Sequence, residues 1–260
     1  MLLEDKAIII TGVGPGMGRE MAMIAAREGA RVAIAARSAD FLSLVVDDIR
    51  AGGGEAIAVP TDVGDTGQCE RLAQTAAASF GRIDGLVNSA VSSLPTGPVE
   101  GGDLDAWMTT MSVSCFGALR MYQAVLPVMK QQRDGAIVNV SSMAAIKPSP
   151  GQAAYAVAKA ALEGATRQLA AEAGPFHVRV NCVRPGWMWG ASVEHHLTAE
   201  AQARGVSVES LAAAVAANIP LGFVPPDAEC AKAVLMLLSD FARMVTGATL
   251  DVNGGEMMSP

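Results

Sequence analysis

Short apolar runs alternate with longer helical segments along the first third of the sequence, and this alternation constrains the fold more than any other feature. The short runs predict strands at residues 6–10, 31–36, 55–60 and 84–88. The longer segments predict helices at about 19–28, 40–51 and 66–80. Strands that alternate with such helices imply right-handed crossovers and a parallel sheet. The sequence therefore predicts a doubly wound α/β fold.

The alternation continues in the second half, with longer elements. Strands are predicted at about 136–140, 176–183 and 249–252, and helices at about 103–129, at 227–238 and around Tyr155 and Lys159. No linker, repeat or change in composition divides the chain, so we predict one domain over residues 1–260. The long segment at about 187–220 begins at the carboxyl end of a strand, where active sites of such sheets lie, and predicts a lid.

A glycine-rich turn, TGVGPGMG at residues 11–18, joins the first predicted strand to the first predicted helix. Backbone N–H groups at a helix N-terminus bind a pyrophosphate in this context. The decisive glycines are Gly12, Gly16 and Gly18, which differ from the common G-x-G-x-x-G spacing. A glycine turn alone is a weak signal. Its position at the first strand-to-helix crossing, where dinucleotides bind in such sheets, predicts a nucleotide site.

The residues after the second and third strands bear on the choice of cofactor. An acidic residue usually ends the second strand when NAD is preferred, because it binds the ribose 2′-hydroxyl. This chain has Ala36 there, followed by Arg37, which could pair with a 2′-phosphate or could be a solvated loop residue. Asp62 could accept a hydrogen bond from the adenine amino group or could cap a loop. The sequence predicts NADP, with NAD as the alternative.

Tyr155 and Lys159 are the candidate catalytic pair. They are four residues apart on a predicted helix and therefore share a face. A cation within about 4 to 6 Å can lower a tyrosine pKa, normally about 10, by about 1 to 3 pKa units, which would allow proton exchange near neutral pH. Ser142 follows the predicted strand 136–140, where its hydroxyl could orient a substrate oxygen. The alternative is an ordinary surface pair on a helix.

Taken together, these motifs resemble the short-chain dehydrogenase/reductase family along essentially the whole chain. The resemblance rests on TGVGPGMG, Asp62-Val63, Asn88-Ser89-Ala90, Ser142, Tyr155-x-x-x-Lys159, and NCVRPG at residues 181–186. It implies a single-domain Rossmann fold with a seven-stranded parallel sheet and helices on both faces. It also implies a nicotinamide cofactor and the interconversion of an alcohol and a carbonyl. The Y-x-x-M-x-x-x-K pattern of related enoyl reductases is absent, so reduction of a C=C bond is less expected.

The same resemblance implies a role for individual residues. Ser142 orients the substrate oxygen, Tyr155 is the acid/base, and Lys159 binds the nicotinamide ribose and lowers the tyrosine pKa. The residues implied in cofactor binding are Gly12, Gly16, Met17, Gly18, Arg37, Asp62, Val63, Asn88, Ala90, Tyr155, Lys159, Pro185 and Gly186. These roles are carried over from the family motifs and not from spacing alone.

The chain departs from the family pattern at three residues near the expected site. Val91 replaces a glycine, Gly190 stands where a threonine often contacts the nicotinamide amide, and Ser114 replaces an asparagine. In the family that asparagine helps to hold a water that connects the lysine to solvent. Ser114 could hold such a water with its single hydroxyl. It could equally bond back to a helix carbonyl and leave the relay elsewhere.

Charge and composition restrict the partners. The net charge is −7, with 19 basic and 26 acidic residues and no Lys/Arg cluster, so nucleic acid and polyanionic carrier proteins are unexpected partners. No apolar run is long enough for a membrane helix, and the N-terminus has acids where a signal peptide needs bases, so we expect a cytoplasmic protein. The four cysteines show no metal-ligand spacing; we expect reduced, mostly buried thiols and no metal site.

Trp187 and Trp189 begin the predicted lid and could line an apolar substrate pocket or anchor the lid by packing. His195 and His196 follow in a polar run and are expected to be solvated. Residues 253–258 predict a turn with apolar residues available for a subunit contact in a dimer or tetramer. The leading prediction is NAD(P)(H)-dependent interconversion of a secondary alcohol and a ketone on a small to medium apolar substrate, cyclic ones included. The alternatives are a 3-oxoacyl thioester reductase and a catalytically weak cofactor-binding or regulatory protein.

Overall fold

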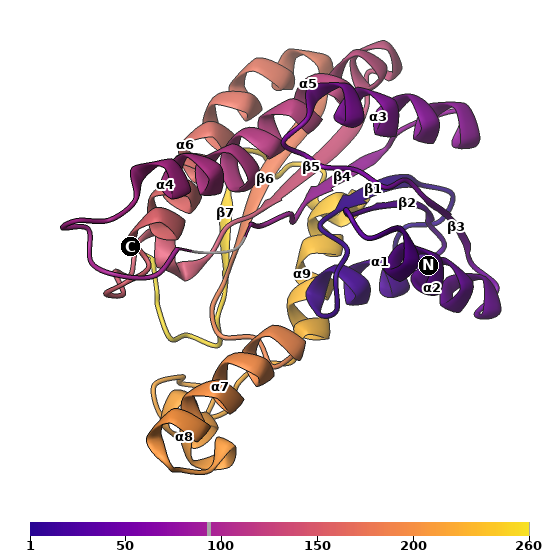
Figure 1. The fold of residues 1–260 in the computed structure, drawn as a ribbon. Coiled ribbons are helices and arrows are strands. Elements are labelled where there is room, and N and C mark those ends of the chain that lie inside the picture. The colour runs from indigo at the N-terminus through magenta and orange to yellow at the C-terminus, as the bar shows by residue number, and fades with distance from the viewer. Residues whose placement is uncertain (93–94, 260) are drawn as a thin grey trace.

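In this computed structural model, which describes residues 1–92 and 95–259, seven parallel strands form one sheet in the order β3-β2-β1-β4-β5-β6-β7 (Figure 1). The strands are β1 Ala7–Thr11, β2 Arg31–Ala35, β3 Glu55–Ala58, β4 Gly85–Asn88, β5 Gly135–Val140, β6 Val178–Pro185 and β7 Thr249–Val252. The strand order reverses between β1 and β4, which is the switch point at which ligands bind in open α/β sheets. The predicted seven-stranded doubly wound sheet is confirmed.

Helices cover both faces of the sheet. The α-helices in the described residues are α1 Met17–Arg27, α2 Ala39–Ala51, α3 Thr66–Phe80, α4 Leu104–Met111, α5 Gly117–Gln132, α6 Ala153–Ala173, α7 Ala191–Arg204, α8 Val208–Ala216 and α9 Asp227–Leu238. One buried cluster joins the sheet to α1, α2 and α9, and another joins it to α3, α5 and α6. The lid helices α7 and α8 lie apart from these two layers (Figure 1).

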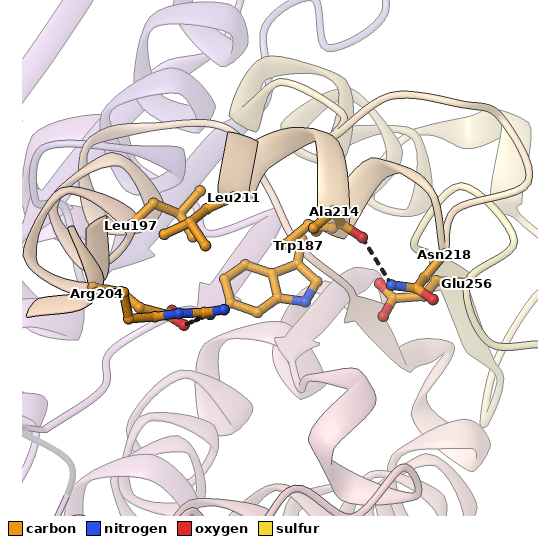
Figure 2. A pocket seen from close by; sticks show the side chains of 9 residues that line it. Trp187, Leu197, Arg204, Leu211, Ala214, Asn218 and Glu256 are labelled. Carbon is orange, nitrogen blue, oxygen red and sulfur yellow. Dashed lines mark hydrogen bonds and ion pairs between the residues drawn. The ribbon is translucent and has the colours of Figure 1, made fainter. Parts of the chain in front are cut away.

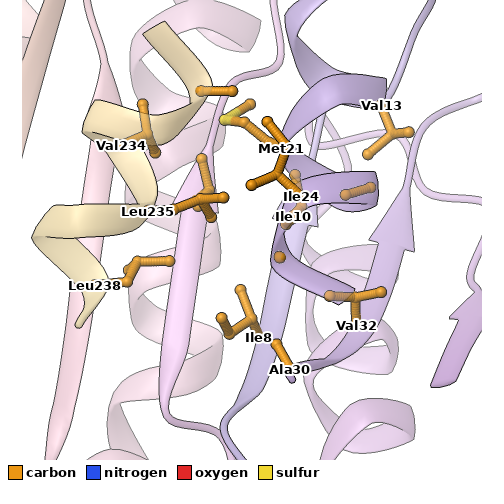
Figure 3. Close-up of a cluster of buried hydrophobic side chains, with 14 of the residues drawn as sticks. Ile8, Ile10, Val13, Met21, Ile24, Ala30, Val32, Val234, Leu235 and Leu238 are labelled. Atoms are coloured by element: carbon orange, nitrogen blue, oxygen red, sulfur yellow. The ribbon is translucent and has the colours of Figure 1, made fainter. Parts of the chain in front are cut away.

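Strand β1 shows why the sheet is buried on both faces. Successive side chains of a strand point to opposite faces. Ile8 and Ile10 therefore pack with α1 and α9, while Ile9 packs on the other face, and all three are at most 1% exposed. Figure 3 shows Ile10 near Met21 of α1, and Ile8 further along the same strand near Ala30. Burying each such side chain contributes about 1.5 to 3 kcal/mol.

Local sequence signals explain several helix ends. Ser38 and Asp65 cap α2 and α3 by accepting backbone N–H bonds, and Gly81 ends α3 in the left-handed conformation at φ 76°. The helix predicted at about 103–129 is present as a continuous helical run over residues 104–132, in which a π-helical turn at Ser112–Phe116 lies between α4 and α5. Such a turn widens the helix by one residue and often marks a functional site, and here it contains Ser114.

The predicted lid contains α7 and α8. Its buried side chains form a small separate cluster of Leu197, Ala201 and Leu211, against which Trp187 and Val193 pack. Backbone hydrogen bonds hold its base: Trp189 N donates to Pro225 O at 2.7 Å, and Asp227 N donates to Trp189 O at 3.0 Å. The lid is thus attached at its base and packs mostly against itself. None of the helices in the described part of the chain has the length and the apolar run needed to cross a bilayer.

Candidate active site

The glycine turn after β1 leaves no room for side chains. Gly12 has φ 74°, and a Cβ there would lie 2.5 Å from the backbone N of Ala90. A Cβ at Gly18 would overlap the carbonyl oxygen of Gly12, and Gly16 has φ 133°. Glycine is therefore favoured at Gly12 and Gly16 by their positive φ, and at Gly12 and Gly18 because neighbouring backbone atoms leave no room for a Cβ.

Two cavities meet at this turn, and together they form one cleft along the carboxyl ends of the strands. The first, about 670 Å³, runs from the glycine turn past Ala36, Arg37, Asp62 and Val63. The second, about 480 Å³, runs from the same turn to Ser142, Tyr155, Lys159, Pro185 and Gly186. Gly12, Gly14, Pro15, Ser89, Val91 and Ser92 line both. The cleft therefore brings together nearly all the predicted cofactor-binding residues with Ser142, Tyr155 and Lys159, whereas Ser114 lines a separate small cavity.

Arg37 and Asp62 line the first cavity, whereas Asn88 does not. Arg37 is exposed and makes no ion pair or hydrogen bond within the described residues. Asp62 Oδ1 accepts from Gly64 N at 2.8 Å, which holds the carboxylate at the cavity wall. Asn88 lies behind the cleft and lines neither large cavity: it is 5% exposed, and its Nδ2 donates to Asn139 Oδ1 at 2.9 Å. The Asn88 side chain thus links β4 to β5, and its contact with the cofactor stays a prediction.

Tyr155 and Lys159 share one face of α6, as predicted, but their electrostatics differ from the prediction. Lys159 Nζ donates to Val140 O at 2.6 Å and lies 5.6 Å from the centroid of the Tyr155 ring. Burial raises the pKa of Tyr155, although its hydrogen bond with Ser142 acts in the opposite direction. Burial also lowers the pKa of Lys159 to about 8. The predicted lowering of the Tyr155 pKa by Lys159 is not found, because burial of the phenol has the larger effect.

A buried network that the sequence reasoning missed fixes helix α6 against the sheet. Ser141 Oγ donates to Glu163 Oε1 at 2.8 Å, and Arg184 makes two bonds to the same carboxylate at 2.7 and 2.8 Å. Arg184 also pairs with Asp251 on β7 at 2.7 Å. Glu163 follows Lys159 by four residues, as Lys159 follows Tyr155, and this spacing could have placed Glu163 on the same face of the helix. The network positions the strand end that carries Ser142 and the helix that carries Tyr155.

Ser114 is buried in the π-helical turn, and its hydroxyl has no hydrogen-bond partner in residues 1–92 and 95–259. The predicted alternative in which it bonds back to a helix carbonyl is therefore wrong. Asn88 Oδ1 is also buried and unpartnered, and both residues line a small cavity of about 10 Å³. A single water needs about this volume and polar partners. The two atoms are placed to share one water.

Asp227, at the start of α9, is the second group that the sequence reasoning missed. It lines the catalytic half of the cleft and accepts a hydrogen bond from Met17 N. Burial, reinforced by the negative charge of Glu20, raises its pKa from 3.8 to about 6. A Cβ at Gly190 would overlap this carboxylate, which explains why glycine occupies the position where threonine was expected. The signal was an acid directly after Pro225-Pro226.

The two lid tryptophans do not line the catalytic half of the cleft. Trp187 lines a separate cavity between α7 and α8, and Trp189 is 36% exposed and contributes its backbone to the lid base. Met188, Ser192 and Val193 line the cleft in their place. His195 and His196 are exposed, as predicted. The substrate role predicted for both tryptophans is therefore replaced, on this geometry, by anchoring of the lid.

The thiols are buried and unpaired, as the sequence predicts. Burial raises the pKa of Cys69 to about 11 and of Cys182 and Cys230 to about 12, so these cysteines stay protonated. In the described part of the chain, no group of three or more His, Cys, Asp and Glu side chains could hold a metal ion.

Comparison with known proteins agrees with this geometry. The sequence model of a family described as enoyl-(acyl carrier protein) reductase matches residues 12–256. A 3-oxoacyl-(acyl-carrier-protein) reductase of Thermotoga maritima is 33% identical over 98% of this chain and 99% of its own length. A trans-4-hydroxycyclohexanecarboxylate dehydrogenase of Sinomonas cyclohexanicum is 34% identical over 98% of this chain and 93% of its own length.

A solved structure of levodione reductase superposes with a TM-score of 0.90 and 29% identity over 98% of both chains. The glycine turn, the divided cleft and the Ser142, Tyr155 and Lys159 group define an oxidoreductase with a dinucleotide site. The chain belongs to the short-chain dehydrogenase/reductase family.

The residues of the cleft fit a nicotinamide dinucleotide. The turn at Gly12 has no room for a Cβ, and it brings the backbone N–H groups at the start of α1 to the middle of the cleft. The guanidinium of Arg37, for which the described part of the chain offers no partner, lies at one end, and the Ser142–Tyr155 pair lies at the other. Arg37, Asp62 and Val63 would hold the adenosine half, and Lys159 and Gly186 the nicotinamide half.

Proposed function

We propose that this protein interconverts a secondary alcohol and a ketone on a small to medium apolar substrate, cyclic ones included, with NADP(H) as the preferred cofactor. The observation that carries the proposal is the Ser142–Tyr155 pair at the end of a cleft that begins at the glycine turn. Two similar proteins are named for ring compounds, levodione and hydroxycyclohexanecarboxylate, and this supports a cyclic substrate.

The side chains divide the chemistry. A bound nicotinamide supplies or accepts the hydride. Tyr155 donates its phenolic proton to the carbonyl oxygen during reduction and removes the hydroxyl proton during oxidation. Ser142 holds that oxygen and bonds to the phenol. Because burial raises the pKa of Tyr155, the phenol carries the proton that it would donate to a carbonyl oxygen during reduction. Lys159, with a pKa of about 8, stays cationic at pH 7.

The preference for NADP(H) rests on Arg37. It is exposed at the rim of the adenosine half, directly after Ala36, and no acid follows β2 to bind a ribose 2′-hydroxyl. A charge-assisted arginine-to-phosphate contact contributes about 1.5 to 3 kcal/mol. NAD(H) remains the alternative cofactor.

A 3-oxoacyl thioester reductase is the second candidate, and the 33% identity to such an enzyme favours it. The net charge of −7, without a basic patch for an acidic carrier, counts against a carrier-bound substrate. A catalytically weak regulatory protein is the third candidate; Ser142, Tyr155 and Lys159 in one cleft count against it.

One experiment separates these candidates. Turnover is followed by absorbance at the nicotinamide band with a panel of cyclic ketones, linear ketones and acetoacetyl thioesters, each with NADPH and NADH. Activity on cyclic ketones with a preference for NADPH supports the proposal. A preference for the thioester supports the second candidate. Absence of turnover on the whole panel, with dinucleotide still bound, supports the third.

We also propose that the chain forms a homo-oligomer, a dimer or tetramer. Large apolar side chains are exposed on the neighbouring helices α4 and α6: Leu104 is 65%, Met108 64% and Val157 47% exposed. A second copy would remove this apolar surface from water. Light scattering with Leu104→Glu/Met108→Glu tests it: the variant should dissociate, and a wild-type monomer would contradict the proposal.

A further inference from the structure

The start of helix α1 already holds an anion that belongs to the protein, the carboxylate of Asp227. The first N–H groups of a helix have no partner within the helix, and they favour a negative charge. Gly16, the residue that caps α1, has no side chain to accept from them. Asp227, at the start of α9, supplies the acceptor for Met17 N instead. A side chain thus occupies a position that α1 offers to the pyrophosphate of a dinucleotide.

The backbone around Asp227 holds its carboxylate in the cleft. A Cβ at Gly16 would lie 3.0 Å from Asp227 Oδ2, and a Cβ at Gly190 would overlap the same oxygen. Asp227 N donates to Trp189 O at 3.0 Å, which fixes the first residue of α9 beside the lid base. The side chain is half-buried and lines the catalytic half of the cleft together with the glycine turn. A bound dinucleotide would therefore meet this carboxylate.

The charges near Asp227 do not neutralise it. The charged residue that shifts its pKa is Glu20 of α1, which is itself negative. On α9, Glu229 pairs with Lys232 at 2.6 Å, and Cys230 stays protonated because burial raises its pKa to about 12. Burial and Glu20 together raise the pKa of Asp227 to about 6, so the carboxylate is charged at pH 7 but is easily protonated.

The other elements around the cleft bring no cation to Asp227. The glycine turn and residues 186–193 contain no titratable side chain. Across the cleft, the ammonium of Lys159 donates to a backbone carbonyl. Figure 2 shows Arg204 and Glu256 at opposite ends of the cavity between α7 and α8, which shares no lining residue with the catalytic half of the cleft. A pyrophosphate and the carboxylate would thus repel each other without a counter-ion from these elements.

We propose that the Asp227 carboxylate competes with the pyrophosphate of the dinucleotide for the start of α1, so that binding of the dinucleotide takes up one proton at Asp227. The proton comes from solvent, because a second negative group at close range favours the neutral form of the carboxyl. The neutral carboxyl can donate its proton to a phosphate oxygen. This role of Asp227 rests on the proposed use of a dinucleotide and makes the affinity for it depend on pH.

Titration calorimetry with NADP⁺ tests the proton uptake without turnover. The heat of binding is measured at pH 7 in Pipes and in imidazole, two buffers with different ionisation enthalpies, and the difference gives the number of protons taken up. Asp227→Asn keeps an acceptor for Met17 N but cannot titrate. The wild type should take up about 0.5 to 0.9 proton more per dinucleotide than Asp227→Asn. Equal uptake would overturn the proposal, because the carboxylate would then move aside while still charged.

The ratio of the two dissociation constants gives a second reading. At pH 5.5 the wild type and Asp227→Asn should bind NADP⁺ almost equally, because both side chains are then mostly neutral. By pH 8 the wild type should bind at least about tenfold more weakly than the variant. The 2′-phosphate and the other groups titrate in both proteins, so the ratio reports residue 227. A ratio that does not change with pH would contradict the proposal.

Glu229→Gln is the matched control on the same helix. It also removes one negative charge, but from a side chain that is 54% exposed, so its proton uptake and pH dependence should equal those of the wild type. A loss of uptake in Glu229→Gln as large as that in Asp227→Asn would refute the assignment to Asp227. Absence of NADP⁺ and NAD⁺ binding in all three proteins would refute the dinucleotide cofactor itself, whereas binding with equal uptake refutes the role of Asp227 alone.

Discussion

The floor of the dinucleotide cleft and the lid differ in how they are held. The floor is made of β1 and β4, whose side chains Ile8, Ile10 and Val87 are fully buried between two layers of helices. The lid buries Leu197, Ala201 and Leu211 in a small cluster of its own. Local opening requires less free energy where fewer apolar contacts must be broken. The catalytic geometry is therefore fixed by the sheet, whereas the shape of the lid depends on a few side chains.

Tyr155→Phe tests whether the cleft that the sheet holds in place carries the proton-transfer step. Because Glu163 and Arg184 fix α6 independently of the phenol, the variant should keep its fold and its dinucleotide affinity. Turnover should fall by about 10² to 10⁴, as for loss of a general acid/base. Steady-state rates and fluorescence titration of NADPH measure the two effects. A variant that retains more than about a tenth of the rate would remove Tyr155 from this role.

A matched pair of truncations tests the comparison directly. Ile10→Ala and Leu197→Ala both remove a buried aliphatic side chain, at 0% and 1% exposure. We expect Ile10→Ala to lower the free energy of unfolding by about 2 to 5 kcal/mol. Leu197→Ala should lower it less and should instead increase proteolytic cleavage within residues 187–220. Urea unfolding measures the free energy of each variant, and limited proteolysis measures cleavage of the lid. An equal loss of unfolding free energy in the two variants would mean that the lid is as firmly packed as the floor.

The adenosine end of the floor offers a third test. Ala36→Asp with Arg37→Ala should reverse the cofactor preference, because an acid at position 36 favours the ribose 2′-hydroxyl and the phosphate loses its cation. The expected change is about 1.5 to 3 kcal/mol, or one to two decades in affinity. Fluorescence titration with NADPH and NADH measures it. Better binding of NADH by the wild type would identify Arg37 as a solvated loop residue.

Asp227, where the lid base meets the floor, should make stability depend on pH. Its folded pKa of about 6 lies above the ordinary 3.8. The stability it contributes is therefore fully present below about pH 4 and is lost as pH rises through 6. Relative to Asp227→Asn, the wild type should lose about 1 to 2 kcal/mol between pH 4 and pH 7.5. Urea unfolding of both proteins at the two pH values measures this, and a constant difference would show that the carboxyl titrates normally.

Ser114→Ala should have the smallest effect. If Ser114 Oγ and Asn88 Oδ1 share a water in the small cavity, its loss should slow proton delivery to the site. We expect a few-fold decrease in turnover, a shifted pH profile of kcat and unchanged dinucleotide affinity. Ser114→Asn should be tolerated. Superimposable profiles for the wild type and Ser114→Ala would exclude the relay.

Much of the floor could be predicted from sequence because its signals are local. A β-branched run, a glycine turn and a helix follow one another within residues 6–28, so Gly12, Gly16 and Gly18 were identifiable. Helix spacing also shows that Lys159 lies near Tyr155, but it does not show how deeply the phenol is buried, and burial is what raises the pKa of Tyr155.

Contacts between distant segments were not predictable in the same way. Asp227 meets Gly190 and Met17 only after β6, α9 and α1 have been assembled. Trp187 and Trp189 are only two residues apart in the sequence, but Trp187 lines the lid cavity and Trp189 is partly exposed. The direction in which a lid side chain points depends on packing that no local pattern records.

The overlap between a Cβ at position 190 and the carboxylate of Asp227 has an evolutionary consequence. A side chain at 190 would displace that carboxylate from Met17 N, so we expect the residues at the two positions to change together. Among relatives, glycine at 190 should be inherited together with an acid at 227, and threonine at 190 should occur where residue 227 does not point toward it. Gly190, which looks like the loss of a cofactor contact, is then one half of a paired substitution. A lineage that gained a side chain at position 190 should have changed position 227 first.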